Sequence, residues 1–238
     1  MTSFKLSSLK IFAAALVAMT LAFTAASPAH AEAKKDFKVA WSIYVGWMPW
    51  GYAMDNGIVK KWADKYDINI EVVQFNDYIE AINQYTAGAY DGVMATNMDA
   101  LAIPSAGGVD STILLICDYS DGNDVIILKG KDDLADIKGQ KVNLVELSVS
   151  HYVLARALEK IGMSEKDVTV VNTSDADMIA AWATRDVTAM TTWNPRAAEI
   201  PTEDNANNVF DSSEIPGEIQ DSLDVNTQTV KDLYLIPL

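Results

Sequence analysis

Apolar and polar positions follow the same order twice along the chain, over residues 71–99 and again over residues 169–196. Each copy starts with an apolar strand and continues through a polar turn that carries an aspartate, Asp77 or Asp175. A helix with one apolar face follows, and then a second strand that ends in an asparagine, Asn97 or Asn194. Two similar βαβ units predict two similar α/β lobes.

The repeated turns predict a ligand cleft between these lobes. Ligands of open α/β sheets bind beyond the carboxyl ends of the strands, and both aspartates and both asparagines fall at that edge. Helix capping is an alternative role for Asp77, because Asn and Asp are favoured N-caps. In the second copy, Ser174 and Asp177 resemble a capping box, which leaves Asp175 freer to face the cleft.

Aromatic side chains follow the first predicted strand, over residues 37–42. The next stretch, 43–50, reads IYVGWMPW and places Trp47 and Trp50 at the carboxyl end of that strand. We expect the two indoles to face the cleft, although covering the core is an equally good interpretation. A third indole, Trp193, ends the second copy of the repeat, and Pro195 follows at the expected position of a hinge.

A second candidate ligand contact is the polar turn after the apolar strand 141–145. Ser148 or Ser150 can cap the helix that follows, whose free N–H groups and positive dipole end suit the negative or carbonyl-like part of a ligand. Glu146 lies in the same turn. His151, in the first helical turn, is either a further ligand contact or a solvated helix-end residue.

The N-terminal pattern is typical of an export signal rather than of a fold. Lys5 and Lys10 precede an apolar run over 11–26, and Ala29-His30-Ala31 form an A-x-A cleavage site. The run is too short to span a bilayer stably, and no cysteine near the cut suggests a lipid anchor. These features predict a signal peptide over 1–31 and a periplasmic protein, with lobe I over 32–118, lobe II over 119–225 and a return segment over 226–238.

Charge and cysteine content exclude several classes of protein. The formal net charge is −15, and removal of the predicted signal with its two lysines makes it more negative, which disfavours nucleic acid and anionic membranes as partners. The single cysteine, Cys117, cannot form an internal disulfide, and we expect it to be a small buried residue. The sequence predicts no metal site and no cofactor.

These motifs together resemble a known family. The aromatic loop, the S-V-S-H helix start, and the NTSDAD and TWNP turns are similar to those of the periplasmic substrate-binding proteins of nitrate/sulfonate/taurine-type ABC importers. The branch associated with urea carboxylase and guanidine degradation is the most similar, and the resemblance covers about residues 38–229. It implies a type II periplasmic-binding-protein fold, α/β in class, with two lobes and a hinge. It also implies a monomer that delivers a small solute to a permease and its ATPase.

The C-terminus departs from this family, whose members continue with helices that cover the first lobe. This chain ends in an apolar tail over 232–238, which reads like a truncation. We therefore expect the first lobe to be incomplete and to expose apolar surface.

The residue types near the predicted cleft favour a small cation. Carboxylates beside aromatic rings bind cations through charge-assisted hydrogen bonds and cation–π contacts, and the nearest arginine is Arg196. Guanidine is our first hypothesis and urea the second, as part of nitrogen uptake; sulfonate, nitrate or taurine is the alternative. The candidate ligand-binding residues are Trp47, Trp50, Asp77, Asn97, Asp99, Glu146, Ser148, Ser150, His151, Asp175, Trp193 and Asn194.

An enzyme is the competing class, because thiamine-pyrimidine synthases share the implied fold. A cysteine-rich, histidine-dependent iron site is typical of those enzymes. This chain has one cysteine and two histidines, and one of the histidines lies in the predicted signal. No nucleophile–base pair or Gly-rich phosphate loop stands out. We expect no catalytic residues; a sensor or a non-functional remnant is a third reading.

Overall fold

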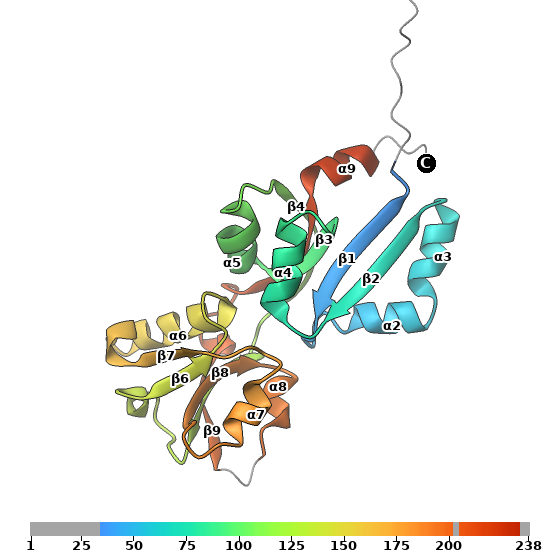
Figure 1. Cartoon of the computed structure of the whole chain (residues 1–238). Helices are drawn as coiled ribbons and strands as arrows, with labels where there is room; N and C mark the ends of the chain where they lie inside the picture. The colour runs from blue at the N-terminus through green and yellow to red at the C-terminus, as the bar shows by residue number, and fades with distance from the viewer. Residues whose placement is uncertain (1–33, 202–204, 234–238) are drawn as a thin grey trace, which may run out of the picture. The chain divides into compact units, whose positions relative to one another are not determined.

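The computed structural model describes residues 34–201 and 205–233 of the chain. The predicted signal peptide over 1–31 and the apolar tail from 234 onward lie outside the described residues. Two five-stranded mixed sheets form the framework, with strand orders β2-β1-β3-β10-β4 and β7-β6-β8-β5-β9 (Figure 1). The two sheets therefore have equivalent strand orders, which confirms the two α/β lobes predicted from the repeat.

In the first sheet, three parallel strands pair with a returning antiparallel strand and then with an edge strand. The strands are β1 (Asp36–Ser42), β2 (Asn69–Phe75), β3 (Gly92–Thr96), β10 (Gln220–Asn226) and β4 (Ser111–Tyr119). Strand β10 thus crosses back to the first lobe late in the chain. The predicted end of lobe II, residue 225, falls near the end of β10, because the chain already rejoins the first sheet at Gln220.

The second sheet has the same plan. Its strands are β6 (Lys141–Leu144), β7 (Thr169–Asn172), β8 (Ala189–Trp193), β5 (Asp124–Lys129) and β9 (Ala206–Asp211). Here β6 is parallel to β7 and β8, while β5 is antiparallel to β8 and β9.

Helices join the strands and cover the sheets. They are α2 (Pro49–Asp55), α3 (Ile58–Lys65), α4 (Tyr78–Thr86), α5 (Asn97–Ala100), α6 (Val149–Lys160), α7 (Met178–Trp182), α8 (Arg196–Glu199) and α9 (Thr227–Leu233). A π-helical turn spans Leu101–Ser105, and 3₁₀ turns span Leu134–Ile137, Glu165–Asp167 and Ser212–Glu214. Among the described residues, no helix is both long enough and apolar enough to cross a membrane.

Local sequence chemistry explains where the two helices nearest the site begin. Asp77 caps α4 by accepting a hydrogen bond from the Glu80 amide at 2.8 Å, and Ser148 caps α6 by accepting one from the Ser150 amide. Asp and Ser supply the acceptor that a free first-turn N–H group needs. The capping role considered for Asp77 is therefore confirmed.

Within the part of the chain that the structure describes, the backbone crosses between the sheets twice, after β4 and after β9. The two crossings are hydrogen-bonded to each other, because the hydroxyls of Ser120 and Ser212 lie 2.8 Å apart and Ser212 also accepts from the Gly122 amide at 2.8 Å. Pro195, expected at a hinge, lies instead between β8 and α8 of the second lobe. The reason is that the hinge is formed by the connections that change sheets, and the β8–α8 turn does not.

Strand β4 exposes a run of apolar side chains at the edge of the first sheet. Ile113, Leu114, Leu115 and Ile116 have exposed fractions between 45% and 52%. Neighbouring residues of a strand point to opposite faces, so both faces of this edge strand are partly open to solvent. The apolar surface expected on the first lobe is thus present, on β4.

Candidate functional site: an acidic aromatic cavity between the two sheets

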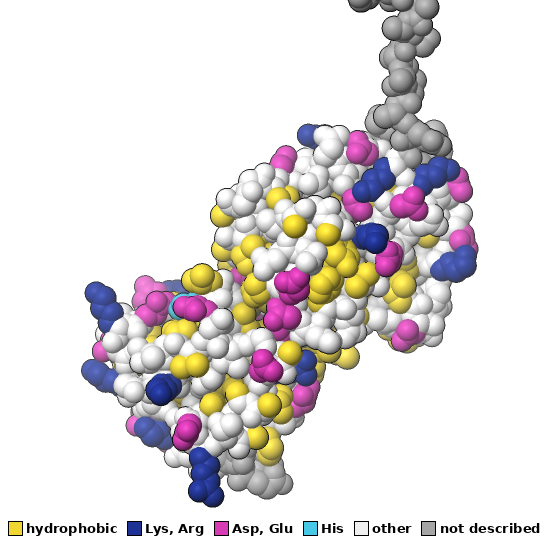
Figure 2. Space-filling view, in the orientation of Figure 1, with side chains coloured by type: hydrophobic (Ala, Val, Ile, Leu, Met, Phe, Trp, Pro, Cys, Tyr) yellow, Lys and Arg dark blue, Asp and Glu magenta, His cyan; other side chains and the backbone are white. Residues whose placement is uncertain are grey.

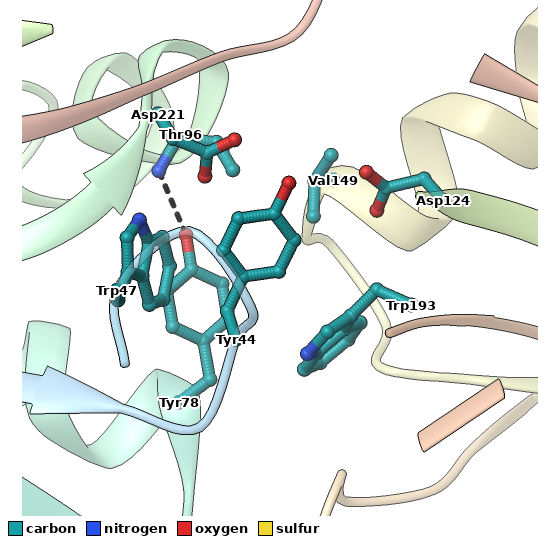
Figure 3. A pocket seen from close by; sticks show the side chains of 8 residues that line it. All are labelled: Tyr44, Trp47, Tyr78, Thr96, Asp124, Val149, Trp193 and Asp221. Carbon is teal, nitrogen blue, oxygen red and sulfur yellow. Dashed lines mark hydrogen bonds between the residues drawn. The ribbon is translucent and has the colours of Figure 1, made fainter. Parts of the chain in front are cut away.

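A buried cavity lies where the ends of the two sheets meet (Figure 3). Its free volume is about 10 Å³, enough for about one water molecule. Both lobes contribute to its wall, which is formed by Tyr44, Trp47, Tyr78, Thr96, Asp124, Val149, Trp193 and Asp221.

Strand direction explains why these residues converge. Thr96 and Trp193 are the last residues of the parallel strands β3 and β8, and the loop with Trp47 follows β1. Asp124 and Asp221 stand at the start of β5 and β10. Because these two strands are antiparallel to β8 and β3, their amino ends lie at the same sheet edge as the carboxyl ends of their neighbours.

Four aromatic rings enclose one side of the cavity. Ring centroids lie 5.0 Å apart for Tyr44 and Trp47, 5.3 Å for Trp47 and Tyr78, and 6.0 Å for Tyr78 and Trp193. These tilted and edge-on geometries are the ones that aromatic pairs prefer. The Trp193 indole N–H donates to the carbonyl of Ile43 at 3.1 Å, so the rings also join the two lobes.

Two carboxyl groups form the polar part of the wall, and both are almost completely buried: Asp124 is 2% exposed and Asp221 is 1% exposed. Burial raises the pKa of Asp124 to about 7, although the Ser120 hydroxyl donates to its carboxylate. Burial, followed by a hydrogen bond to Asp118 and the nearby charges of Asp118 and Asp124, raises the pKa of Asp221 to about 9. Burial next to a like charge disfavours the ionised form of a carboxyl group.

Gly46 makes room for the acidic side of the cavity. A Cβ atom at this position would lie 1.8 Å from Oδ2 of Asp118 and 2.8 Å from the Tyr44 ring. The loop after β1 therefore passes so close to Asp118 that a larger residue would displace its carboxyl group and the Tyr44 ring. The Tyr44 hydroxyl is affected by the same surroundings. Burial, followed by the nearby charges of Asp221, Asp124 and Asp118, raises its pKa.

A third buried carboxylate lies behind the wall. Asp99 is 1% exposed; its Oδ2 accepts from the Tyr78 hydroxyl at 2.7 Å and from the Val149 amide at 3.2 Å. Burial raises the pKa of Asp99 to about 6, and these two hydrogen bonds oppose the shift. The carboxylate thus connects the first lobe to the start of α6 in the second.

Asp175 and Asp77 lie near each other but outside the aromatic cavity. Asp175 accepts from the Tyr78 amide at 3.2 Å, and its other oxygen has no hydrogen-bond partner among the described residues. Burial raises the pKa of Asp175 to about 6, Asp77 adds to this shift, and Arg196 opposes it.

Asp77 and Glu146 line a separate open groove with a free volume of about 450 Å³. Figure 2 shows acidic side chains on the face that carries α4.

The other predicted site residues make structural contacts. Trp50 directs its N–H to the sulfur of Met94 at 3.1 Å, Asn97 bonds to the backbone of Glu218 and Gln220, and Asn194 lies 3.4 Å from Asn123. A further group surrounds the start of α6. Ser148 caps the helix, the Ser150 hydroxyl is buried without a partner among the described residues, and His151 accepts from the Leu147 amide at 3.1 Å.

Of the twelve candidates, Trp47 and Trp193 line the cavity, and Asp99 and Asp175 contact its Tyr78 wall. Ligand contact by any of the twelve stays a prediction. Sequence reasoning missed the other residues of the wall, which are Tyr44, Tyr78, Thr96, Asp124, Val149 and Asp221. A signal existed for Tyr44, which belongs to the aromatic loop.

Comparison with known proteins places the chain in a family. Residues 60–232 match the model of a family described as NMT1/THI5 like. The chain belongs to the NMT1/THI5-like family. Over 101 residues it is 30% identical to a protein of Brucella abortus (strain 2308) named as a binding protein. That match covers 42% of this chain and 31% of the relative, so the chain spans about a third of the relative's length.

Solved structures of binding proteins share the fold of this NMT1/THI5-like chain. The alkanesulfonate-binding protein SsuA from Xanthomonas axonopodis pv. citri, bound to MOPS, has a TM-score of 0.71 at 18% identity; 85% of this chain and 72% of that chain are covered. The nitrate-binding protein NrtA from Synechocystis PCC 6803 has a TM-score of 0.67 at 12% identity, with coverages of 83% and 57%. The fold is that of the type II periplasmic binding proteins, as predicted.

Proposed function

We propose that this chain is the solute-binding component of an ABC importer. It would be exported to the periplasm, hold a small solute between its lobes as a monomer, and deliver it to a permease driven by an ATPase. Membership of the NMT1/THI5-like family and the fold shared with alkanesulfonate- and nitrate-binding proteins support this role. So does the cavity, since periplasmic binding proteins close by hinge motion around a ligand.

We further propose that the solute is a small nitrogenous cation, with guanidinium as the first choice. The composition of the cavity wall carries this proposal. The described residues that line it include two carboxyl groups and four aromatic rings, but neither lysine nor arginine. A guanidinium ion offers paired N–H donors that match the two oxygens of a carboxylate, and aromatic faces attract cations. Urea, which is neutral, would not offset the cost of ionising Asp124 and Asp221 in a buried site, whereas a bound cation would.

Solute entry requires the lobes to part, because the closed cavity has room for about one water. The pair of crossings held together by Ser120 and Ser212 is the natural axis of this movement. Asp124 follows the first crossing and Asp221 follows the second. Opening at these connections would therefore expose both carboxyl groups to a solute at the same time.

An oxyanion is the second candidate solute, and the likeness to alkanesulfonate- and nitrate-binding proteins favours it. The composition of the wall opposes it, because an anion would disfavour ionisation of Asp124 and Asp221 and would meet no basic residue among the described residues that line the cavity. An enzyme of the thiamine-pyrimidine type is less well supported. Burial, with Asp118 and Asp221 nearby, raises the pKa of Cys117 to about 11, which makes its thiol a poor nucleophile.

A ligand screen by thermal denaturation tests the proposal. Guanidinium chloride at about 100 times its dissociation constant should raise the melting temperature by about 5–10 °C. Sodium chloride at equal ionic strength serves as the control, and urea should give a smaller shift. A rise with nitrate, taurine or methanesulfonate and none with guanidinium would exclude the cation assignment.

A further inference from the structure

The N-terminus of helix α6 reaches the cavity, but its first backbone N–H groups are already hydrogen-bonded. Val149, the first residue of this twelve-residue helix, lines the cavity and donates its amide to Asp99. The Ser150 amide donates to the Ser148 hydroxyl, and the amides of His151 and Tyr152 donate to the Ser148 carbonyl at 2.9 and 3.1 Å. All four amides of the first turn are thus engaged.

This arrangement matters because a helix N-terminus attracts anions. Its first N–H groups lack partners within the helix, and the helix dipole places partial positive charge there. An oxyanion entering a cavity at such a terminus would normally bind these donors. Here the protein's own carboxylate already occupies the position.

Asp99 is held in place by a network that belongs to the first lobe. The Tyr78 hydroxyl donates to Asp99 and accepts from the Thr96 amide at 3.0 Å, and the Asp99 amide donates to the Thr96 hydroxyl at 3.4 Å. Both Tyr78 and Thr96 line the cavity. The carboxylate therefore meets α6 of the second lobe only when the two lobes are together.

We propose that Asp99 determines the sign of the charge that the cavity accepts. Its carboxylate acts as an internal anion that occupies the N-terminus of α6 in the closed state and repels oxyanions, which leaves Asp124 and Asp221 to bind a cation. The idea rests on the proposed solute-binding function and deepens it. Removal of Asp99 would free the Val149 amide, and the buried Ser150 hydroxyl, which has no partner among the described residues, is a further donor in the same turn.

Asp99→Ser tests this proposal with nitrate and methanesulfonate as probes in calorimetric titrations. The variant should bind at least one of these anions on the order of 10-fold or more tightly than the unaltered protein does. Asp124→Ser is the matched control. It removes another buried carboxyl group and frees no donor of α6, so any gain in anion affinity should be clearly smaller than in Asp99→Ser.

A second readout is the backbone amide resonance of Val149. In Asp99→Ser, and in Asp99→Ala if the serine variant does not fold, this resonance should shift on addition of nitrate, and in Asp124→Ser it should not. Equal anion binding by the Asp99 and Asp124 variants, or a Val149 resonance that ignores nitrate in every folded Asp99 variant, would overturn the role of Asp99. Guanidinium binding by the unaltered protein is scored separately, so a failure there counts against the proposed function alone.

Discussion

Tyr78→Ala is expected to lower the free energy of unfolding by about 3–5 kcal/mol, the range for truncation of a buried aromatic side chain, and to abolish solute binding. The ring lies between Trp47 and Trp193, and the hydroxyl holds Asp99. Its loss would leave a void in the cavity wall and remove the donor of a buried carboxylate. Urea denaturation measures the first effect, and calorimetric titration with guanidinium measures the second.

Tyr85→Ala is the matched control, since Tyr85 is on the same helix and equally buried, but it bonds to Ser111 and does not line the cavity. It should lose a similar amount of stability and keep its affinity for the solute once folded. If Tyr85→Ala abolished binding while Tyr78→Ala retained it, the cavity would not be the binding site.

The second large effect concerns pH. We expect the ligand-free protein to lose stability steadily as the pH rises from about 5 to about 9. The pKa values of Asp99 and Asp175 are raised to about 6, that of Asp124 to about 7 and that of Asp221 to about 9. Because all four lie above the ordinary value of 3.8, the folded state binds more protons than the unfolded state in this range. The free energy of unfolding therefore falls with increasing pH.

Asp221→Asn isolates the largest of these contributions. The variant should flatten the decline between about pH 7 and about pH 9 by up to about 1.4 kcal/mol per pH unit, the linkage slope of one group. Urea denaturation series across this range, for both proteins, provide the test. Stability that is constant or rises with pH in the unaltered protein would show that the buried carboxyl groups are not protonated as their surroundings imply.

The sequence repeat was sufficient to predict the two α/β lobes. Each copy carries a strand, a helix and a second strand, and these became β2-α4-β3 in one lobe and β7-α7-β8 in the other. Helix α4 has a side-chain cap, whereas α7 has none. The apolar periodicity and the cap at Asp77 are local features, so they can be read without knowledge of tertiary structure. The aromatic loop after β1 was predicted for the same reason.

The carboxyl groups of the cavity could not be predicted in this way. Asp124 and Asp221 begin strands that run antiparallel to their neighbours, and sequence alone does not give strand direction. A rule based on the carboxyl ends of parallel strands selected Asp77 and Asp175 in their place. Asp77 proved to cap α4 at an adjacent groove, and Asp175 to contact Tyr78 from behind the wall.

The most direct test of the central claim is a calorimetric titration of the purified protein with guanidinium chloride at about pH 7.5, repeated in two buffers of different ionisation enthalpy. Capture of a cation by Asp124 and Asp221 should favour their ionised forms, so the account predicts saturable binding with release of protons to the buffer. Binding of nitrate or methanesulfonate, with no response to guanidinium in either buffer, would contradict it.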